Sequence, residues 1–308
     1  MSFGYQVLGF GSSASASSLN LFGSRGVFVG GFTSSYVNTI DYITIANTGN
    51  ATDFGNTGVT KRGAGATTNG SRGVIGAGKT TGNGTINVIE YITIATTGNA
   101  TDFGDLTVAR NTVAATSNGS RGVFGGGNSS GDTIDYITID TTGNATDFGN
   151  LVTTNEVLSA TSNGPRGVFG GGYNAGSNLD VLQYITIATT GNTTDFGNLT
   201  VARHGLAATS DGSRGVFAGG DSGSRSNVID YIAIDTTGNA TDFGNLTVAR
   251  FGIGATSDGS RGVFGGGQLA DSSKTDVIDY ITIANTGNAT DFGDLEDERY
   301  LCTSTSGT

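Results

Sequence analysis

Short apolar runs separated by Gly-rich and Thr-rich turns fill nearly the whole chain. A run such as Gly122-Val123-Phe124 is followed by Ile134-Asp135-Tyr136-Ile137, in which apolar and polar residues alternate. Alternation with a period of two is typical of β-strands, and the Asn-Gly and Thr-Gly-Asn segments between the runs favour tight hairpins. No stretch has the 3.6-residue period of an amphipathic helix, so the pattern predicts an all-β fold.

Three short markers recur six times along the chain with a period of 45 to 49 residues. An Arg-Gly-Val marker begins at Arg25, Arg72, Arg121, Arg166, Arg214 and Arg261. A Tyr-Ile marker begins at Tyr42, Tyr91, Tyr136, Tyr184, Tyr231 and Tyr280. An Asp-Phe-Gly marker begins at Asp53, Asp102, Asp147, Asp195, Asp242 and Asp291. A repeat of this length is typical of a propeller blade.

Each repeat is predicted to form four short strands, which we name A to D. In the third repeat they cover residues 113–117, 121–125, 134–139 and 144–148. Strand A contains small residues, which fit the crowded axis of a propeller. Phe148 and its counterparts on strand D are large enough to fill the widening gap between outer strands. The sequence therefore predicts a six-bladed β-propeller with four-stranded blades.

The two ends of the chain complement each other in the register of the repeat. Residues 299–308 match strand A, with Thr305-Ser306 aligned to Thr116-Ser117. We expect this C-terminal strand A to close the first blade and to remove exposed sheet edges. The propeller then spans residues 23–308 and leaves residues 1–22 as an N-terminal docking segment. The residues expected to dock it to another subunit are Tyr5, Val7, Leu8, Phe10, Leu21 and Phe22.

Charge and composition exclude several classes of function. The net charge of −11 argues against nucleic acid as a partner, because no basic stripe could neutralise phosphates. No apolar run approaches the ~20 residues that cross a bilayer, so we expect no membrane insertion. The chain has a single His, His204, and a single Cys, Cys302, which falls on an inner strand A. We therefore expect no multi-His metal site, no cofactor and no catalytic residue.

The repeated charged and polar motifs have structural interpretations. Asp-Phe-Gly occurs six times without the other signatures of a protein kinase, so we interpret it as an aromatic anchor followed by a turn Gly. In Asn-Ala-Thr segments such as Asn50-Ala51-Thr52, we expect the Asn to occupy a left-handed turn position. The strand-B Arg and the strand-D Asp recur in fixed register, and we expect them to form a repeated structural charge pair.

The order of these markers resembles the Kelch repeat over residues 23–308, with Phe54 and its counterparts in place of the usual Trp. The Tyr-Ile-Thr-Ile-Ala-Thr-Thr-Gly-Asn-Ala-Thr-Asp-Phe-Gly units also resemble repeat proteins encoded by tailed bacteriophages, as does the opening segment from Tyr5 to Gly11. This resemblance implies a non-enzymatic virion protein, such as a fibre, spike or capsid-surface component. Its implied partners are other virion proteins and a host-surface glycan or protein. Its implied location is the particle surface, after assembly in the cytoplasm of the infected bacterium.

The face that carries the B–C and D–A loops is the candidate binding face, because all length variation in the repeat falls between the Arg and Tyr markers. The B–C loops carry Tyr36 and Tyr173. A cationic ring at the start of strand A, broken by Asn155, comprises Lys61, Arg110, Arg203, Arg250 and Arg299. These cations either bind carboxylate groups of a glycan or partner, or pair with acids of the protein itself. A sialidase-like enzyme and a Kelch-type interaction scaffold are the alternative functions.

Overall fold

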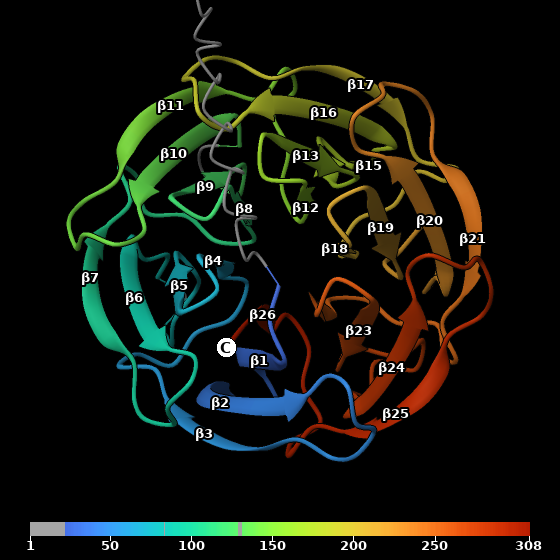
Figure 1. The fold of residues 1–308 in the computed structure, drawn as a ribbon, viewed down its shortest axis with the longest axis horizontal. Coiled ribbons are helices and arrows are strands. Elements are labelled where there is room, and N and C mark those ends of the chain that lie inside the picture. The colour runs from blue at the N-terminus through green and yellow to red at the C-terminus, as the bar shows by residue number, and fades with distance from the viewer. Residues whose placement is uncertain (1–21, 83, 129–130) are drawn as a thin grey trace, which may run out of the picture.

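The structure is a computed structural model that describes residues 22–82, 84–128 and 131–308. These residues form β-strands and no helix, and the strands build six four-stranded antiparallel sheets around a central axis (Figure 1). The six sheets are the blades of a six-bladed propeller, as the sequence predicted. A small hairpin of β14 (Tyr173–Asn174) and β15 (Ser177–Asn178) is added between strands B and C of blade 4.

Within each blade the strands follow the order A to D from the axis outward. Blade 1 consists of β26 (Thr303–Gly307), β1 (Arg25–Phe32), β2 (Tyr36–Thr44) and β3 (Thr52–Asn56). Blade 2 consists of β4 (Gly65–Thr68), β5 (Arg72–Gly76), β6 (Val88–Thr93) and β7 (Thr101–Asp105). Blade 3 consists of β8 (Ala114–Ser117), β9 (Arg121–Gly125), β10 (Thr133–Thr138) and β11 (Thr146–Asn150). Blade 4 consists of β12 (Ser159–Ser162), β13 (Arg166–Gly170), β16 (Val181–Thr186) and β17 (Thr194–Asn198). Blade 5 consists of β18 (Ala207–Ser210), β19 (Arg214–Ala218), β20 (Val228–Ala233) and β21 (Thr241–Asn245). Blade 6 consists of β22 (Gly254–Ser257), β23 (Arg261–Gly265), β24 (Val277–Thr282) and β25 (Thr290–Asp294).

The hydrophobic core lies between neighbouring blades. Ile134 and Phe148 of blade 3, for example, pack in one cluster with Phe169 and Ile185 of blade 4. The Phe of strand B reaches so close to the preceding blade that a Cβ on Gly125 would lie 2.6 Å from the Phe169 ring. Each blade therefore needs its neighbours to bury its apolar faces, which favours a closed ring over an open stack.

The Asp-Phe-Gly marker forms a β-bulge at the outer edge of each blade. In blade 3, Ile134 pairs with Gly149 and Asp135 pairs with Asp147, so Phe148 is the extra residue. Its ring is buried, in an edge-to-face contact with Tyr136 at a centroid distance of 6.1 Å. The following Gly149 has a φ of 145°, and a Cβ there would lie 2.5 Å from the carbonyl oxygen of Gly191 in the next blade. The motif is thus structural, as predicted.

The Asn of the Asn-Ala-Thr segments has a different role from the predicted one. It is the preceding Gly143 that adopts a positive φ, of 154°, in blade 3. The Asn144 side chain instead accepts a hydrogen bond from the Asp105 N–H of blade 2 at 3.0 Å, and Gly143 N donates to the Phe103 carbonyl at 2.7 Å. The same contacts join every C–D turn to strand D of the preceding blade, so these turns hold the outer rim together.

The predicted charge pair between strand B and strand D is wrong. The Arg121 guanidinium lies over the Tyr136 ring, 4.2 Å from its centroid, and donates to the Ile187 carbonyl of the next blade at 3.0 Å. Asp147 is exposed and has no ion pair among the described residues. The repeated Arg therefore links blades through a backbone carbonyl, and cation–π contact with Tyr holds its orientation.

The C-terminal strand closes the ring in the predicted register. Strand β26 pairs with β1, and Thr305 lies opposite Val27 as Thr116 lies opposite Val123 in blade 3. Gly49 of blade 1 also donates to the Phe292 carbonyl of blade 6 at 2.8 Å. Blade 1 is thus built from both ends of the chain and joined to blade 6 by the same rim contact as every other pair of blades.

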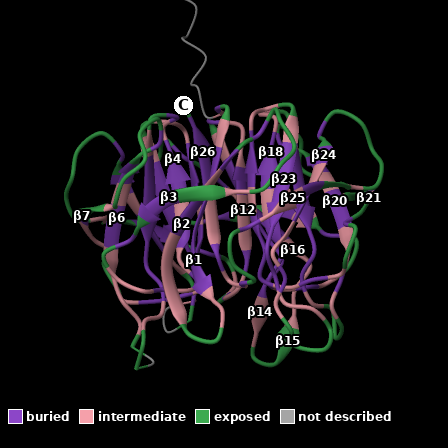
Figure 2. Cartoon of the chain, turned by 90° about the horizontal axis from the view of Figure 1, so that it is seen from below, coloured by how far each residue is buried: buried purple, intermediate pink, exposed green. Residues whose placement is uncertain are grey.

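The propeller has two faces that carry different connections between strands (Figure 2). The turn face carries the A–B and C–D turns, and the C-terminus lies there. The loop face carries the B–C and D–A connections, and the hairpin of β14 and β15 projects from it. The axis runs between these faces and is lined by the strands A.

Candidate functional site

The predicted cationic ring lies at the loop-face end of the strands A, but its side chains point inward and are buried. Arg110, Arg203, Arg250 and Arg299 are 0% exposed and Lys61 is 1% exposed. Each cation forms an ion pair with a buried acid on strand C of its own blade. The pairs are Lys61–Glu90, Arg110–Asp135, Arg203–Asp230, Arg250–Asp279 and Arg299–Asp41. The interpretation as a ligand-binding ring is therefore corrected: these cations pair with acids of the protein.

Blade 4 shows that cation and acid belong together, since it lacks both. Asn155 replaces the cation and donates to the Gly171 carbonyl at 2.7 Å. Gln183 replaces the acid and accepts a hydrogen bond from the Thr193 hydroxyl at 2.6 Å. Thr193 stands where five blades have Ala. The three changes together remove both charges and supply a hydroxyl donor to the buried amide oxygen of Gln183, which avoids the cost of burying an unpaired ion. Gln183 Nε2 has no hydrogen-bond partner among the described residues.

The pair that closes the ring, Arg299 with Asp41, is the least satisfied. In blades 3, 5 and 6 a Thr hydroxyl from the D–A connection donates to the buried carboxylate. Glu296 occupies that place in blade 1, and Asp41 Oδ1 has no hydrogen-bond partner. Burial raises the pKa of Asp41 to about 6, Arg299 opposes this shift, and Glu296 adds to it. The closing blade therefore carries the pair with the fewest hydrogen-bond partners among the five.

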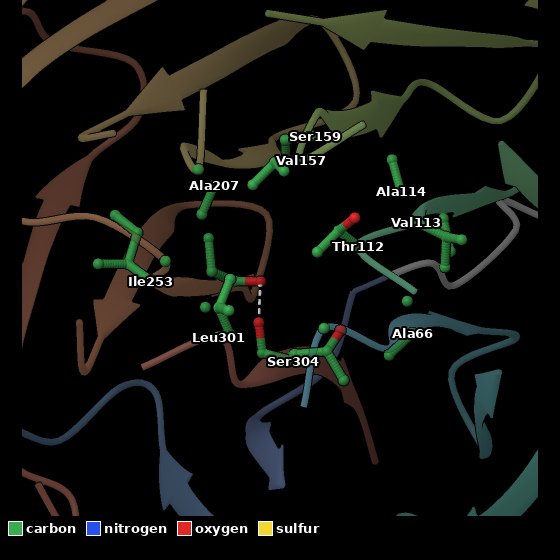
Figure 3. Close-up of a pocket in the computed structure, with 18 of the residues that line it drawn as sticks. Ala66, Thr112, Val113, Ala114, Val157, Ser159, Ala207, Ile253, Leu301 and Ser304 are labelled. Carbon is green, nitrogen blue, oxygen red and sulfur yellow. Dashed lines mark hydrogen bonds between the residues drawn. The ribbon is translucent and has the colours of Figure 1, made fainter. Parts of the chain in front are cut away.

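A cavity of about 110 Å³ lies on the axis near the loop face and is lined by the strands A and the residues just before them (Figure 3). Its lining combines Gly, Ala and small polar residues with larger apolar ones such as Val113, Val157, Ile253 and Leu301. A closed ring of six backbone hydrogen bonds surrounds it at that end, each residue donating its N–H to the carbonyl of the preceding blade's residue. Its members are Gly63, Thr112, Val157, Gly205, Gly252 and Leu301, with N–O distances from 2.6 to 3.1 Å. All six have a positive φ, which is costly for Thr112, Val157 and Leu301. The ring fixes the relative positions of the six blades at the loop face.

The other end of the axis opens on the turn face, where Phe22 covers a second cavity of about 100 Å³. The Phe22 ring lies against Gly212 and Gly259, at the A–B turns of blades 5 and 6. Phe22 therefore contacts the propeller, and it is the one residue of the predicted docking segment 1–22 that the structure describes. Tyr5, Val7, Leu8, Phe10 and Leu21 lie outside the described residues. The N-terminal segment is thus joined to the propeller at the turn face.

Aromatic side chains form a continuous arc over the loop face, which we call the aromatic arc. Its neighbouring rings have centroid distances of 4.9 to 6.3 Å. In order, its members are Tyr36, Phe32, Tyr300, Phe251, His204 and Tyr173. Each ring is half-buried, so part of it faces solvent. The arc extends over blades 1, 6, 5 and 4 and breaks the sixfold symmetry of the propeller.

The arc brings together two predicted site residues and several that the sequence analysis missed. Tyr36 and Tyr173 lie at its opposite ends. His204, Phe251 and Tyr300 occupy one equivalent position in successive D–A connections, which also holds Arg62, Asn111 and Glu156 in the other blades. A hydrogen bond of 2.7 Å joins His204 Nδ1 to Asn178 Oδ1. Burial lowers the pKa of His204. His204 thus packs as an aromatic member of the arc.

Cations lie against the arc at two points. Arg225 lies 4.8 Å from the centroid of Phe251 and is ion-paired with Asp221. Arg62 lies 5.2 Å from the centroids of both Phe32 and Tyr36 and donates to the Tyr300 hydroxyl at 2.8 Å. The face therefore combines flat apolar surfaces with hydrogen-bond donors and positive charge, a composition typical of binding surfaces.

Groups that could support metal or thiol chemistry are few. Within residues 22–82, 84–128 and 131–308, no three His, Cys, Asp or Glu side chains gather where they could hold a metal ion. Cys302 is buried on the axial side of blade 1, and burial raises the pKa of its thiol. The same described residues contain no helix long and apolar enough to cross a membrane.

Comparison with known proteins gives no family. No protein-family model matches the chain, and no curated protein sequence matches it either. The function must therefore be argued from the fold and from the loop face.

Proposed function

We propose that this chain is a non-enzymatic binding propeller of a bacteriophage virion, a fibre, spike or capsid-surface component. It attaches to the particle on the side of its turn face and recognises a host-surface glycan or protein with its loop face. One observation carries this proposal: the loop face is where the six near-identical repeats differ, and the differences collect there in one aromatic arc flanked by cations. The likeness of the repeats to phage-encoded repeat proteins supports the virion setting.

The turn face supports the attachment half of the proposal. It is regular, since six equivalent C–D turns are used to join neighbouring blades. Phe22 fixes the start of the propeller over the axis on this face, so residues 1–21 connect there. A protein held on this side directs its loop face away from the attachment point. Loops on a rigid scaffold are where binding function is usually placed.

Exchange of the B–C loops tests the proposal. The loops of blades 1, 4 and 6 are replaced by Asn128-Ser129-Ser130-Gly131 of blade 3. Because these loops lie outside the blade sheets, the variant should fold and give a single thermal transition. It should lose attachment to cells of the host bacterium. The matched control is Thr142→Lys, an exposed change in a C–D turn on the turn face, which should leave cell attachment intact.

Equal attachment by the loop-exchanged and unchanged proteins would contradict the proposal. Binding of an intracellular partner peptide, with no attachment to the host surface, would favour the Kelch-type scaffold instead. Hydrolysis of a host glycan by the unchanged chain would favour the sialidase-like alternative.

A further inference from the structure

The partners of the 15 Lys and Arg residues show which positive charges are available to a ligand. All 15 lie in the described part of the chain, because residues 1–21 contain no Lys or Arg. The six strand-B Arg donate to carbonyls of neighbouring blades. Five cations form the buried pairs, and Arg225 pairs with Asp221. Arg62, Lys79 and Lys274 remain, and these three described cations have no ion pair.

The three remaining cations all lie on the loop face. Arg62 and Lys79 are paired by a β-bridge between a D–A connection and a B–C loop of blade 2, and Lys274 is in the B–C loop of blade 6. In a protein with a net charge of −11, acids are abundant, yet none is placed against these three side chains. They are therefore the positive charges that a ligand could neutralise.

Two of the three converge on one aromatic ring. The Arg62 guanidinium is 5.2 Å from the Phe32 centroid, and the Lys274 ammonium is 5.7 Å from it. Tyr36 and Tyr300 stand edge-to-face against the same ring, at centroid distances of 5.4 and 5.8 Å. We call these five residues the Phe32 cluster. They come from blades 1, 2 and 6, so the cluster exists only in the closed ring.

We infer that the Phe32 cluster binds a carboxylated sugar residue of a surface glycan. A sugar ring has an apolar C–H face that packs on aromatic rings. The planar Arg62 fork can bind both oxygens of a carboxylate, and Lys274 adds a second positive charge. The inference rests on the proposed function, because it assigns a ligand to the same face.

The size of the cluster favours a sugar over an extended acidic partner. Two cations and one central aromatic ring match one carboxylate attached to one ring. An acidic peptide would need a line of unpaired cations, whereas the next cation along the arc, Arg225, is already paired with Asp221. The small number of unpaired cations also disfavours nucleic acid as a ligand, since several phosphates must be neutralised at once.

Calorimetric titration of the purified full chain tests this inference. The probes are tetragalacturonate, its neutral methyl ester, sialyllactose and neutral lactose, with hexaglutamate as the acidic peptide. At least one acidic sugar should bind, and its neutral counterpart should bind at least about tenfold more weakly, as loss of a charge-assisted carboxylate contact implies. Arg62→Gln, Lys274→Gln and Phe32→Leu should each weaken binding by about tenfold, while each variant keeps a single cooperative thermal transition.

Two variants on the same face serve as matched controls. Arg225→Gln removes a cation that lies over an aromatic ring but is already paired, and Lys79→Gln removes an unpaired cation that contacts no aromatic ring among those described. Each should change the affinity by less than about threefold, the effect of a more distant charge.

Several results would overturn the inference: no binding of either acidic sugar, equal binding of a neutral counterpart, stronger binding of hexaglutamate, or equal losses in Arg225→Gln and Arg62→Gln. Loss of cell attachment on loop exchange, with full attachment by Arg62→Gln, would reject this site alone. Full attachment by the loop-exchanged protein would reject the proposed function as well.

Discussion

Arg299, close to the C-terminus, donates a hydrogen bond of 2.7 Å to Asp41 in the first blade. Both side chains are 0% exposed, so this contact joins the two ends of the chain inside the protein. The neighbouring strand β26 continues the junction by pairing with β1. Closure thus combines a buried ion pair with a complete strand.

Deletion of residues 299–308 should abolish cooperative folding. Blade 1 would lose its innermost strand, Asp41 would be buried without its cation, and both edges of the opened ring would be exposed. Thermal unfolding followed by circular dichroism checks this. Deletion of residues 1–21 is the control and should keep a sharp transition, because residues 22–308 contain all the strands of the six blades. A single sharp transition in the protein that lacks residues 299–308 would count against the closure scheme.

Asp135→Gln should destabilise the protein by about 3–5 kcal/mol, because it leaves Arg110 buried without a counter-charge. The triple change Arg110→Asn, Asp135→Gln and Ala145→Thr reproduces the neutral arrangement of blade 4 and should recover most of that loss. Urea denaturation gives both values. A triple variant no more stable than the single variant would show that pairing is not what the two charged positions share.

The contribution of Asp41 to the free energy of unfolding should increase as the pH falls from 7 toward 5. Its pKa of about 6 in the folded protein exceeds the ordinary 3.8, so the folded state binds the proton more tightly than the unfolded state does. The ionised group therefore lowers the free energy of unfolding above pH 6, and that penalty is removed as the pH falls through 6 toward 3.8. Urea midpoints at pH 7 and pH 5 measure the effect.

Glu296→Thr should reduce this pH dependence. It supplies the hydroxyl donor that blades 3, 5 and 6 provide and removes a neighbouring negative charge, so the pKa of Asp41 should fall. Stability at pH 7 should rise by about 1–2 kcal/mol, the worth of a hydrogen bond to a charged group. Thr247→Glu in blade 6 is the converse change and should introduce the dependence there. An unchanged pH profile in Glu296→Thr would show that Asp41 does not cause it.

The repeat made the fold predictable, because blade number, strand order and closure all follow from register. The loop-face position of the cationic ring followed from the same reasoning. The burial of the ring did not follow from it, because Arg110 points inward to form an ion pair with Asp135 on strand C. The sequence did contain a signal for this pairing: one repeat has the neutral Asn155 in place of the cation and the neutral Gln183 in place of the acid.

The aromatic arc was harder to predict, because it depends on contacts between repeats that differ from one another. His204, Phe251 and Tyr300 were recognisable as one variable position. That their rings contact one another, and that Tyr300 contacts Phe32, depends on the distance between neighbouring D–A connections, which no single repeat reveals. The Asn of the C–D turns was misjudged for the same reason, as its partner lies in another blade.

Selective blocking of the two faces tests most directly whether the loop face is the recognition surface. The only Cys is buried, so a thiol introduced on the surface can be coupled to polyethylene glycol selectively. Coupling at Ser34→Cys, on the loop face, should abolish attachment to host cells and leave incorporation into the particle intact. Coupling at Thr142→Cys, on the turn face, should leave cell attachment intact. Cell attachment that survives coupling at Ser34→Cys and is lost at Thr142→Cys would contradict the assignment of the two faces.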